Sequence, residues 1–129
     1  MTASEKYVQA RIRDLLACRG IETKKMHGTA LNVGWPDVFA GRFWIEVKAP
    51  GKKLRPSQVD WFETFVDRMG AVAYVCDDHR KLWSIIGDGT GMGKLGVRPS
   101  NWRDFAPKVH HKVRLSSALS DWATPPGKG

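Results

Sequence analysis

Two carboxylates and one ammonium group follow one another in a pattern that could bind a divalent cation. Asp37 ends the segment 34–37 (GWPD), and Glu46 and Lys48 follow inside an apolar stretch. Alternate side chains of a strand share a face, so Glu46 and Lys48 would lie on one face about 7 Å apart. If the strand that begins at Asp37 pairs with this one, the Asp37 and Glu46 carboxylates converge. The pattern therefore predicts a cation site beside a positive charge.

Such a site would suit the hydrolysis of a phosphodiester. Mg2+ prefers oxygen ligands, commonly one or two carboxylates with water and substrate phosphate oxygens. Asp37 and Glu46 would supply the carboxylates, and the main-chain carbonyl of Val47 a further oxygen. Lys48 could orient or help to deprotonate the attacking water and offset charge on the phosphate. The alternative is a solvated strand face with a Glu–Lys pair, because the acidic pair and lysine alone often occur by chance.

Composition favours a polyanionic partner for a chain of one domain. The 129 residues carry a net charge of +8, and 42% of them are hydrophobic. This charge indicates nucleic acid, since the basic C-terminal part contains no amphipathic basic helix typical of membrane binding. The sequence has neither a membrane span nor the core of a signal peptide, so we expect a cytoplasmic protein and no membrane partner. Cys18 and Cys76 have apolar neighbours and are interpreted as buried, reduced thiols.

Periodicity and turn residues predict an α/β fold, in which helices flank a mixed central sheet. We expect residues 1–87 to form the core and residues 88–129 a basic extension of the same domain. Most of the six Trp are expected to pack in the core or an interface. Expected helices cover residues 4–19, 56–69 and a short turn from Asp77 or Asp78 to Ile86; expected strands cover residues 21–27, 38–40, 43–49 and 71–76.

Residues 34–77 resemble the VRR-NUC family of the PD-(D/E)xK nuclease superfamily. The matching segments are 34–37 (GWPD), 45–52 (IEVKAPGK), 55–58 (RPSQ) and 70–72 (GAV). The resemblance implies a restriction-endonuclease-like core, dependence on Mg2+ with Mn2+ able to substitute, and hydrolysis of DNA phosphodiester bonds. Small standalone members, typical of bacteria and phage, resemble Holliday-junction resolvases and act as homodimers.

The same resemblance extends to residues outside the central motif. Gln58 matches a glutamine that would position the water or the lysine; the alternative is a local hydrogen bond in the first turn of its helix. Glu5 matches an acidic residue near the metal, although Thr2 and Glu5 also have the spacing of a helix capping box. Three cations that follow the motif could contact phosphates or simply be solvated; they are Lys52, Lys53 and Arg55.

We therefore expect a Mg2+-dependent, structure-selective endodeoxyribonuclease that acts on branched DNA such as Holliday junctions. Its catalytic residues would be Asp37, Glu46, Lys48 and Gln58. Two alternatives stay open: a nuclease of the same fold that cuts linear duplex or flap DNA, and a basic DNA-binding protein without catalytic activity.

Overall fold

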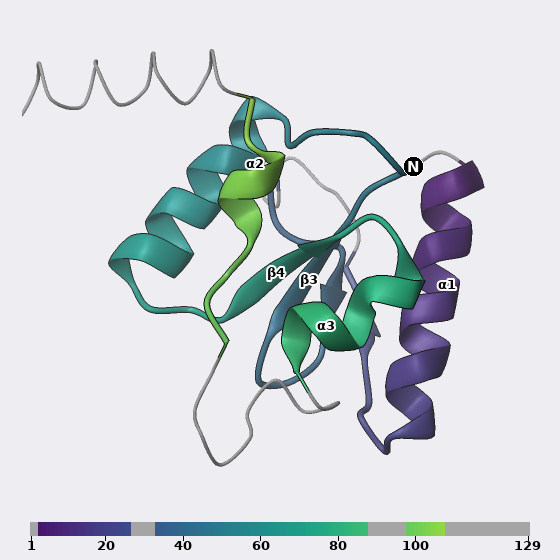
Figure 1. Cartoon of the computed structure of the whole chain (residues 1–129). Coiled ribbons are helices and arrows are strands. Elements are labelled where there is room, and N and C mark those ends of the chain that lie inside the picture. Colours follow the sequence, from purple (N-terminus) through teal and green to yellow (C-terminus); the bar gives the residue numbers. More distant parts are fainter. Residues whose placement is uncertain (1–2, 27–32, 88–97, 108–129) are drawn as a thin grey trace, which may run out of the picture.

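The computed structural model describes residues 3–26, 33–87 and 98–107. These residues form a mixed α/β fold in which a four-stranded sheet has helices on both faces (Figure 1). The α/β prediction with a mixed central sheet is thus confirmed. The elements are α1 (Ala3–Cys18), β1 (Lys24–Lys25), β2 (Val38–Phe39), β3 (Trp44–Val47), α2 (Pro56–Trp61), the π-helix η2 (Phe62–Arg68), β4 (Ala73–Cys76), the 3-10 helices η3 (His79–Lys81) and η4 (Trp102–Phe105), and α3 (Leu82–Ile86).

The sheet has the strand order β1-β2-β3-β4. Strands β1, β2 and β3 are antiparallel neighbours, whereas β3 and β4 are parallel and are connected through α2 and η2. The β2–β3 hairpin closes where the Ala40 amide donates to the Phe43 carbonyl at 2.9 Å. Gly41 occupies the first position of the turn with φ of 86°, a backbone conformation that glycine adopts without strain. The predicted hairpin through Gly41 and Arg42 is confirmed.

Side chains from alternate positions of β3 pack on opposite faces of the sheet. On one face Ile45 and Val47 join a core cluster with α1 and α3, and on the other Trp44 packs against a cluster with α2. Figure 1 shows β3 and β4 between α2 on one side and α1 and α3 on the other. Glu46 is two residues after Trp44 in the strand, so its side chain lies on the same face, toward α2.

Helix α1 covers the first face through apolar side chains at helical spacing. Val8, Ile12 and Leu16 are buried in the core cluster. After the helix, the Ile21 amide bonds to the Leu16 carbonyl at 3.0 Å, and Gly20 has φ of 74°. This is the Schellman arrangement in which a glycine ends a helix, as the sequence predicted.

The helix expected over residues 56–69 has the predicted start and end but a different middle. It begins at Pro56, and after Trp61 it widens into the π-helix Phe62–Arg68, in which the Met69 amide donates to the Thr64 carbonyl at 3.1 Å. The wider turns accompany close ring packing, since Trp61 and Phe65 stack with centroids 5.0 Å apart. Such packing cannot be read from periodicity.

Residues 98–107 pack against the free edge of β4. The Asn101 side chain both accepts from the Val75 amide and donates to the Val75 carbonyl, each at 2.8 Å, so it replaces a neighbouring strand there. Trp102 is fully buried in the cluster on the α2 face, which confirms the expected core packing for this Trp. The remainder of residues 88–129 lies outside the described residues.

Other element boundaries differ modestly from prediction. Strands β3 and β4 are shorter than expected, and the strand expected over residues 21–27 contains only Lys24–Lys25 within the described residues; His27 lies outside them. The short helix after β4 begins as predicted, because the Asp78 carboxylate accepts from the Arg80 amide at 2.9 Å. No helix in the described part of the chain is long and apolar enough to cross a membrane.

Candidate active site

Asp37 immediately precedes β2, and Glu46 lies on the neighbouring antiparallel strand β3. The register pairs Val38 with Ile45, so its extension by one residue would set Asp37 opposite Glu46, and the two side chains interact with each other. Residues directly opposite in such a ladder have Cβ atoms about 4.5–5.5 Å apart on the same face. The structure therefore brings together the two carboxylates that the sequence predicted to converge.

Main-chain and amide groups hold the two carboxylates in place. The Val47 amide donates to Asp37 Oδ2, and the Gln58 side-chain Nε2 donates to Glu46 Oε2, each at 2.8 Å. The other oxygen of Glu46, Oε1, is buried and has no hydrogen-bond partner among the described residues. A buried carboxylate oxygen without a donor is costly. A cation bound at Oε1 would remove that cost, so the donor set fits a hard divalent ion.

The electrostatics of the pair also favour a cation. Burial raises the pKa of Glu46 well above its usual value, and repulsion from Asp37 raises it further, against the opposing effect of Lys48. Burial likewise raises the pKa of Asp37, and the hydrogen bond from Val47 partly offsets this. Two carboxylates this close repel each other, which disfavours ionisation of the pair. A divalent cation bound between them would offset that repulsion.

Lys48 lies beside the pair but does not neutralise it through a hydrogen bond. Its Nζ is 3.8 Å from Glu46 Oε2, which exceeds a hydrogen-bond distance although it permits an ion pair. Lys48 is 5% exposed and Glu46 is 2% exposed. The end of β3 is held to β4 because the Lys48 amide donates to the Cys76 carbonyl at 3.1 Å. The ammonium group therefore lies close to Glu46 without a hydrogen bond to it.

Gln58 is oriented by the start of α2. Its Oε1 accepts from the Arg55 main-chain amide at 2.8 Å, so its Nε2 faces Glu46. Gln58 is 3% exposed, and both ends of its amide are therefore used inside the protein. The structure places this amide on Glu46 and not on Lys48. Gln58 is thus a positioning residue for the carboxylate.

Gly34 explains why the segment before Asp37 can approach α2. A Cβ added to Gly34 would lie 2.3 Å from the Ser57 carbonyl oxygen, and φ at Gly34 is 86°. Only glycine allows both this backbone conformation and this contact. The loop that carries Asp37 is thereby packed against the first turn of the helix that carries Gln58.

Glu5 lies near this group but does not complete a three-residue ligand cluster. Its charge raises the pKa of Asp37, so it is within electrostatic reach. No group of three or more His, Cys, Asp or Glu side chains suited to a metal occurs in residues 3–26, 33–87 and 98–107. The capping-box alternative involves Thr2, which lies outside the described residues.

The sequence analysis did not single out Gln9. This side chain is one helical turn after Glu5 and is 3% exposed, and its Nε2 has no hydrogen-bond partner among the described residues. The sequence does contain a sign that Gln9 is unusual, because this polar residue interrupts the apolar helix face formed by Val8, Ile12 and Leu16.

The three predicted phosphate-binding cations follow β3 directly. Lys52, Lys53 and Arg55 are all exposed. Lys53 donates from Nζ to the Asp104 carbonyl at 3.1 Å, so it is partly engaged with the C-terminal segment. Arg55 is close enough for its charge to lower the pKa of Glu46. Of the three, Arg55 therefore lies within electrostatic reach of the carboxylate pair.

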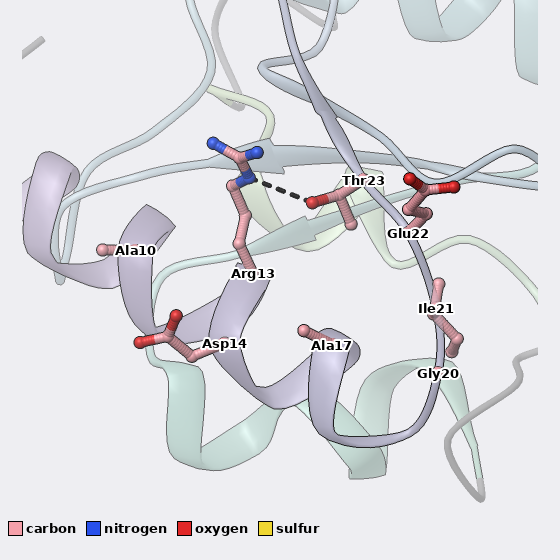
Figure 2. A pocket seen from close by; sticks show the side chains of 8 residues that line it. All are labelled: Ala10, Arg13, Asp14, Ala17, Gly20, Ile21, Glu22 and Thr23. Carbon is pink, nitrogen blue, oxygen red and sulfur yellow. Dashed lines mark hydrogen bonds between the residues drawn. The ribbon is translucent and has the colours of Figure 1, made fainter.

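A cavity of about 550 Å³ lies between α1 and residues 20–23. Figure 2 shows Arg13 extending from α1 to Thr23, where its Nε donates to Oγ1 at 2.9 Å. None of the four candidate catalytic residues lines this cavity, so it is separate from the carboxylate pair.

Comparison of the chain with family models, with curated proteins and with solved structures found no match. The assignment of a function therefore depends on the geometry of the residues themselves and on the resemblance of residues 34–77.

Proposed function

We propose that this protein is a metal-dependent endonuclease that hydrolyses DNA phosphodiester bonds. The observation that carries the proposal is the pairing of the half-buried Asp37 with the buried Glu46. One Glu46 oxygen has no hydrogen-bond partner among the described residues, and the Lys48 ammonium lies beside the pair. The hairpin that presents the pair, followed by a helix that presents Gln58, is compatible with the restriction-endonuclease-like core implied by the VRR-NUC resemblance.

The residues of the site would have three roles: metal ligands, a positive charge beside the phosphate, and a side-chain amide that positions one ligand. Asp37 and Glu46 would hold Mg2+ or Mn2+, with the Val47 carbonyl as a further oxygen and Glu5 as a nearby charge. The ion supplies Lewis acidity and a more acidic bound water. Lys48 would offset the negative charge that grows on the phosphate oxygens and help to deprotonate the attacking water. Gln58 keeps Glu46 in the orientation that leaves Oε1 open.

Charge supports DNA as the substrate. The net charge is +8, and the exposed cations Lys52, Lys53 and Arg55 follow the strand that carries Glu46 and Lys48. Phosphate contacts of this kind position a backbone without reading its sequence. We propose branched DNA as the preferred substrate and a homodimer in the bacterial cytoplasm as the active form; both follow from the resemblance to small standalone VRR-NUC proteins.

Metal binding is tested first, apart from cleavage. Titration of the purified protein with Mn2+, followed by electron paramagnetic resonance, should show binding that Glu46→Gln abolishes. Glu22→Gln removes an exposed carboxylate outside the site and should bind as the wild type does. Equal binding by the wild type and Glu46→Gln would contradict the metal site.

Cleavage is then measured on linear, flap, three-way and four-way DNA in Mg2+. Lys48→Ala should reduce the rate by about 10²–10³-fold, the usual effect of removing a group that stabilises transition-state charge. Lys25→Ala removes an exposed cation on β1 and should change the rate little. Equal cleavage of linear and branched DNA would reject structure selectivity. DNA binding without Mg2+-dependent cleavage of any substrate would show a non-catalytic DNA-binding protein.

A further inference from the structure

A second cavity, of about 720 Å³, opens between the first turns of α1 and the segment that follows β4. Tyr7 and Val8 line it from α1, Pro50 from the turn after β3, and Asp77, His79 and Arg80 from the segment after β4. Figure 1 shows that segment running beside α1. The cavity is large enough for a nucleobase with its sugar.

None of the four candidate catalytic residues lines this cavity, but the backbone of its wall is continuous with the strand that carries Glu46 and Lys48. Pro50 is two residues after Lys48, and the Gly51 amide donates to Asp77 Oδ2 at 3.4 Å. The Lys48 amide is bonded to the carbonyl of Cys76, the residue before Asp77. Pro50 and Asp77, which line the cavity, therefore follow soon after the ends of β3 and β4, and these strand ends position Lys48.

An aromatic pair gives the cavity a surface on which a base can stack. The Tyr7 and His79 rings meet edge to face, with centroids 5.7 Å apart and an angle of 79° between their planes. Tyr7 is nevertheless 60% exposed, which is unusual for so large a side chain and leaves ring surface open to a ligand. Stacking on an aromatic side chain suits any of the four bases.

The charges of the cavity favour a base over a phosphate. Both carboxylate oxygens of Asp78 are engaged by Arg80, which donates from Nε to Oδ1 and from a terminal nitrogen to Oδ2, each at 3.0 Å. Within the described residues Asp77 accepts only the long bond from Gly51, so it retains acceptor capacity. A carboxylate repels phosphate but accepts hydrogen bonds from the amino groups of bases.

We propose that this cavity holds an unpaired nucleobase of the DNA strand next to the scissile phosphate. The inference rests on the proposed nuclease function and adds to it a physical reason for selecting branched DNA. A base can enter only where it is not stacked in a duplex, as at a junction or a flap. The Tyr7–His79 pair provides the stacking surface, and Asp77 accepts from the base edge.

Crosslinking tests occupancy directly. A four-way junction with 5-iodouracil at the unpaired or branch-point positions is bound to full-length Lys48→Ala protein, irradiated and analysed by mass spectrometry. Crosslinks at Tyr7 or His79 are expected. Crosslinks confined to other residues would overturn the proposal. Crosslinking measures binding and does not require cleavage. If Tyr7 crosslinked but the wild-type protein cleaved no DNA, the base site would be supported and only the nuclease function would be rejected.

Kinetics provide the second test. Tyr7→Ala should raise KM for a flap or junction about 5- to 140-fold, the equivalent of losing one base stack of roughly 1–3 kcal/mol. Tyr7→Phe keeps the ring and should restore the wild-type KM. Met69→Ala, a control that also truncates an exposed apolar side chain, should leave KM unchanged. An unchanged KM for Tyr7→Ala, in a variant with wild-type Tm, would refute the base site and leave the nuclease proposal intact.

Discussion

Replacement of Gly34 by alanine tests how the structure couples the Asp37 loop to α2. Two costs arise at this position. An L-residue at positive φ costs about 1–2 kcal/mol, and the new Cβ would lie 2.3 Å from the Ser57 carbonyl oxygen, where backbone must move. Forcing extra atoms into a packed site costs about a further 1–3 kcal/mol.

Gly41 offers a matched control. Its φ is also 86°, but an added Cβ there meets nothing within 4 Å. Gly41→Ala therefore incurs the conformational cost alone, and the difference between the two variants isolates the contact with Ser57. We expect Gly34→Ala to melt roughly 4–12 °C below Gly41→Ala, given about 4 °C for each kcal/mol in a domain of this size.

The assay is thermal unfolding of both variants by circular dichroism, followed by Mn2+ titration. Because Ser57 precedes Gln58, displacement of the first turn of α2 should also weaken metal binding in Gly34→Ala but not in Gly41→Ala. Equal Tm values for the two variants would show that the close approach to Ser57 is absent in solution, and the reasoning about this loop would be wrong.

Three other predictions concern buried polar groups. Gln58→Ala should reduce metal affinity by about 10–100-fold, as loss of a hydrogen bond to a ligand commonly does, and calorimetry would measure it. Burial and the charge of Asp37 raise the folded-state pKa of Glu46, so the metal-free protein should lose stability as pH rises above the ordinary pKa of 4.5. The increase in Tm caused by Mg2+ should therefore grow with pH. An increase in Tm that stays the same from pH 5 to 9 would contradict this. Cys76 is buried as the sequence predicted, but Cys18 is exposed, so that part of the prediction was wrong. At pH 8 a thiol reagent should modify Cys18, whereas Cys76, whose pKa burial raises to about 11, should react only in urea. Rapid modification of both thiols in the folded protein would refute this.

Local rules predicted the parts of the fold that depend on neighbours in sequence. Alternation along residues 43–48 predicts that Glu46 and Val47 lie on opposite faces. The structure confirms this, because Val47 lies in the cluster with α1 whereas Glu46 accepts a hydrogen bond from Gln58 of α2. Gly20 and Gly41 ended a helix and closed a hairpin where expected, because positive φ is a local property.

Contacts between distant residues were beyond such rules. Asn101 replaces a strand at the edge of β4, and Gln58 uses both ends of its amide between Arg55 and Glu46. At the start of the π-helix, Trp61 packs against Trp35, which is distant in the chain, as well as against the nearby Phe65. Such arrangements depend on which side chains meet, and a single sequence does not record that.

The sequence by itself determined that Glu46 and Lys48 share one strand face in a strongly basic chain, because the alternation of side chains along a strand and the net charge require only the residue types. The tertiary structure alone decided the hydrogen-bond partners, the burial and the pKa values of these groups. Pairing of β2 with β3 brings Asp37, which precedes β2, next to Glu46. Packing of α2 directs Gln58 to one oxygen of Glu46, while the other has no hydrogen-bond partner in the part of the chain that the structure describes. Burial then raises the pKa of both carboxyls, because desolvation depends on the surroundings that the whole fold creates.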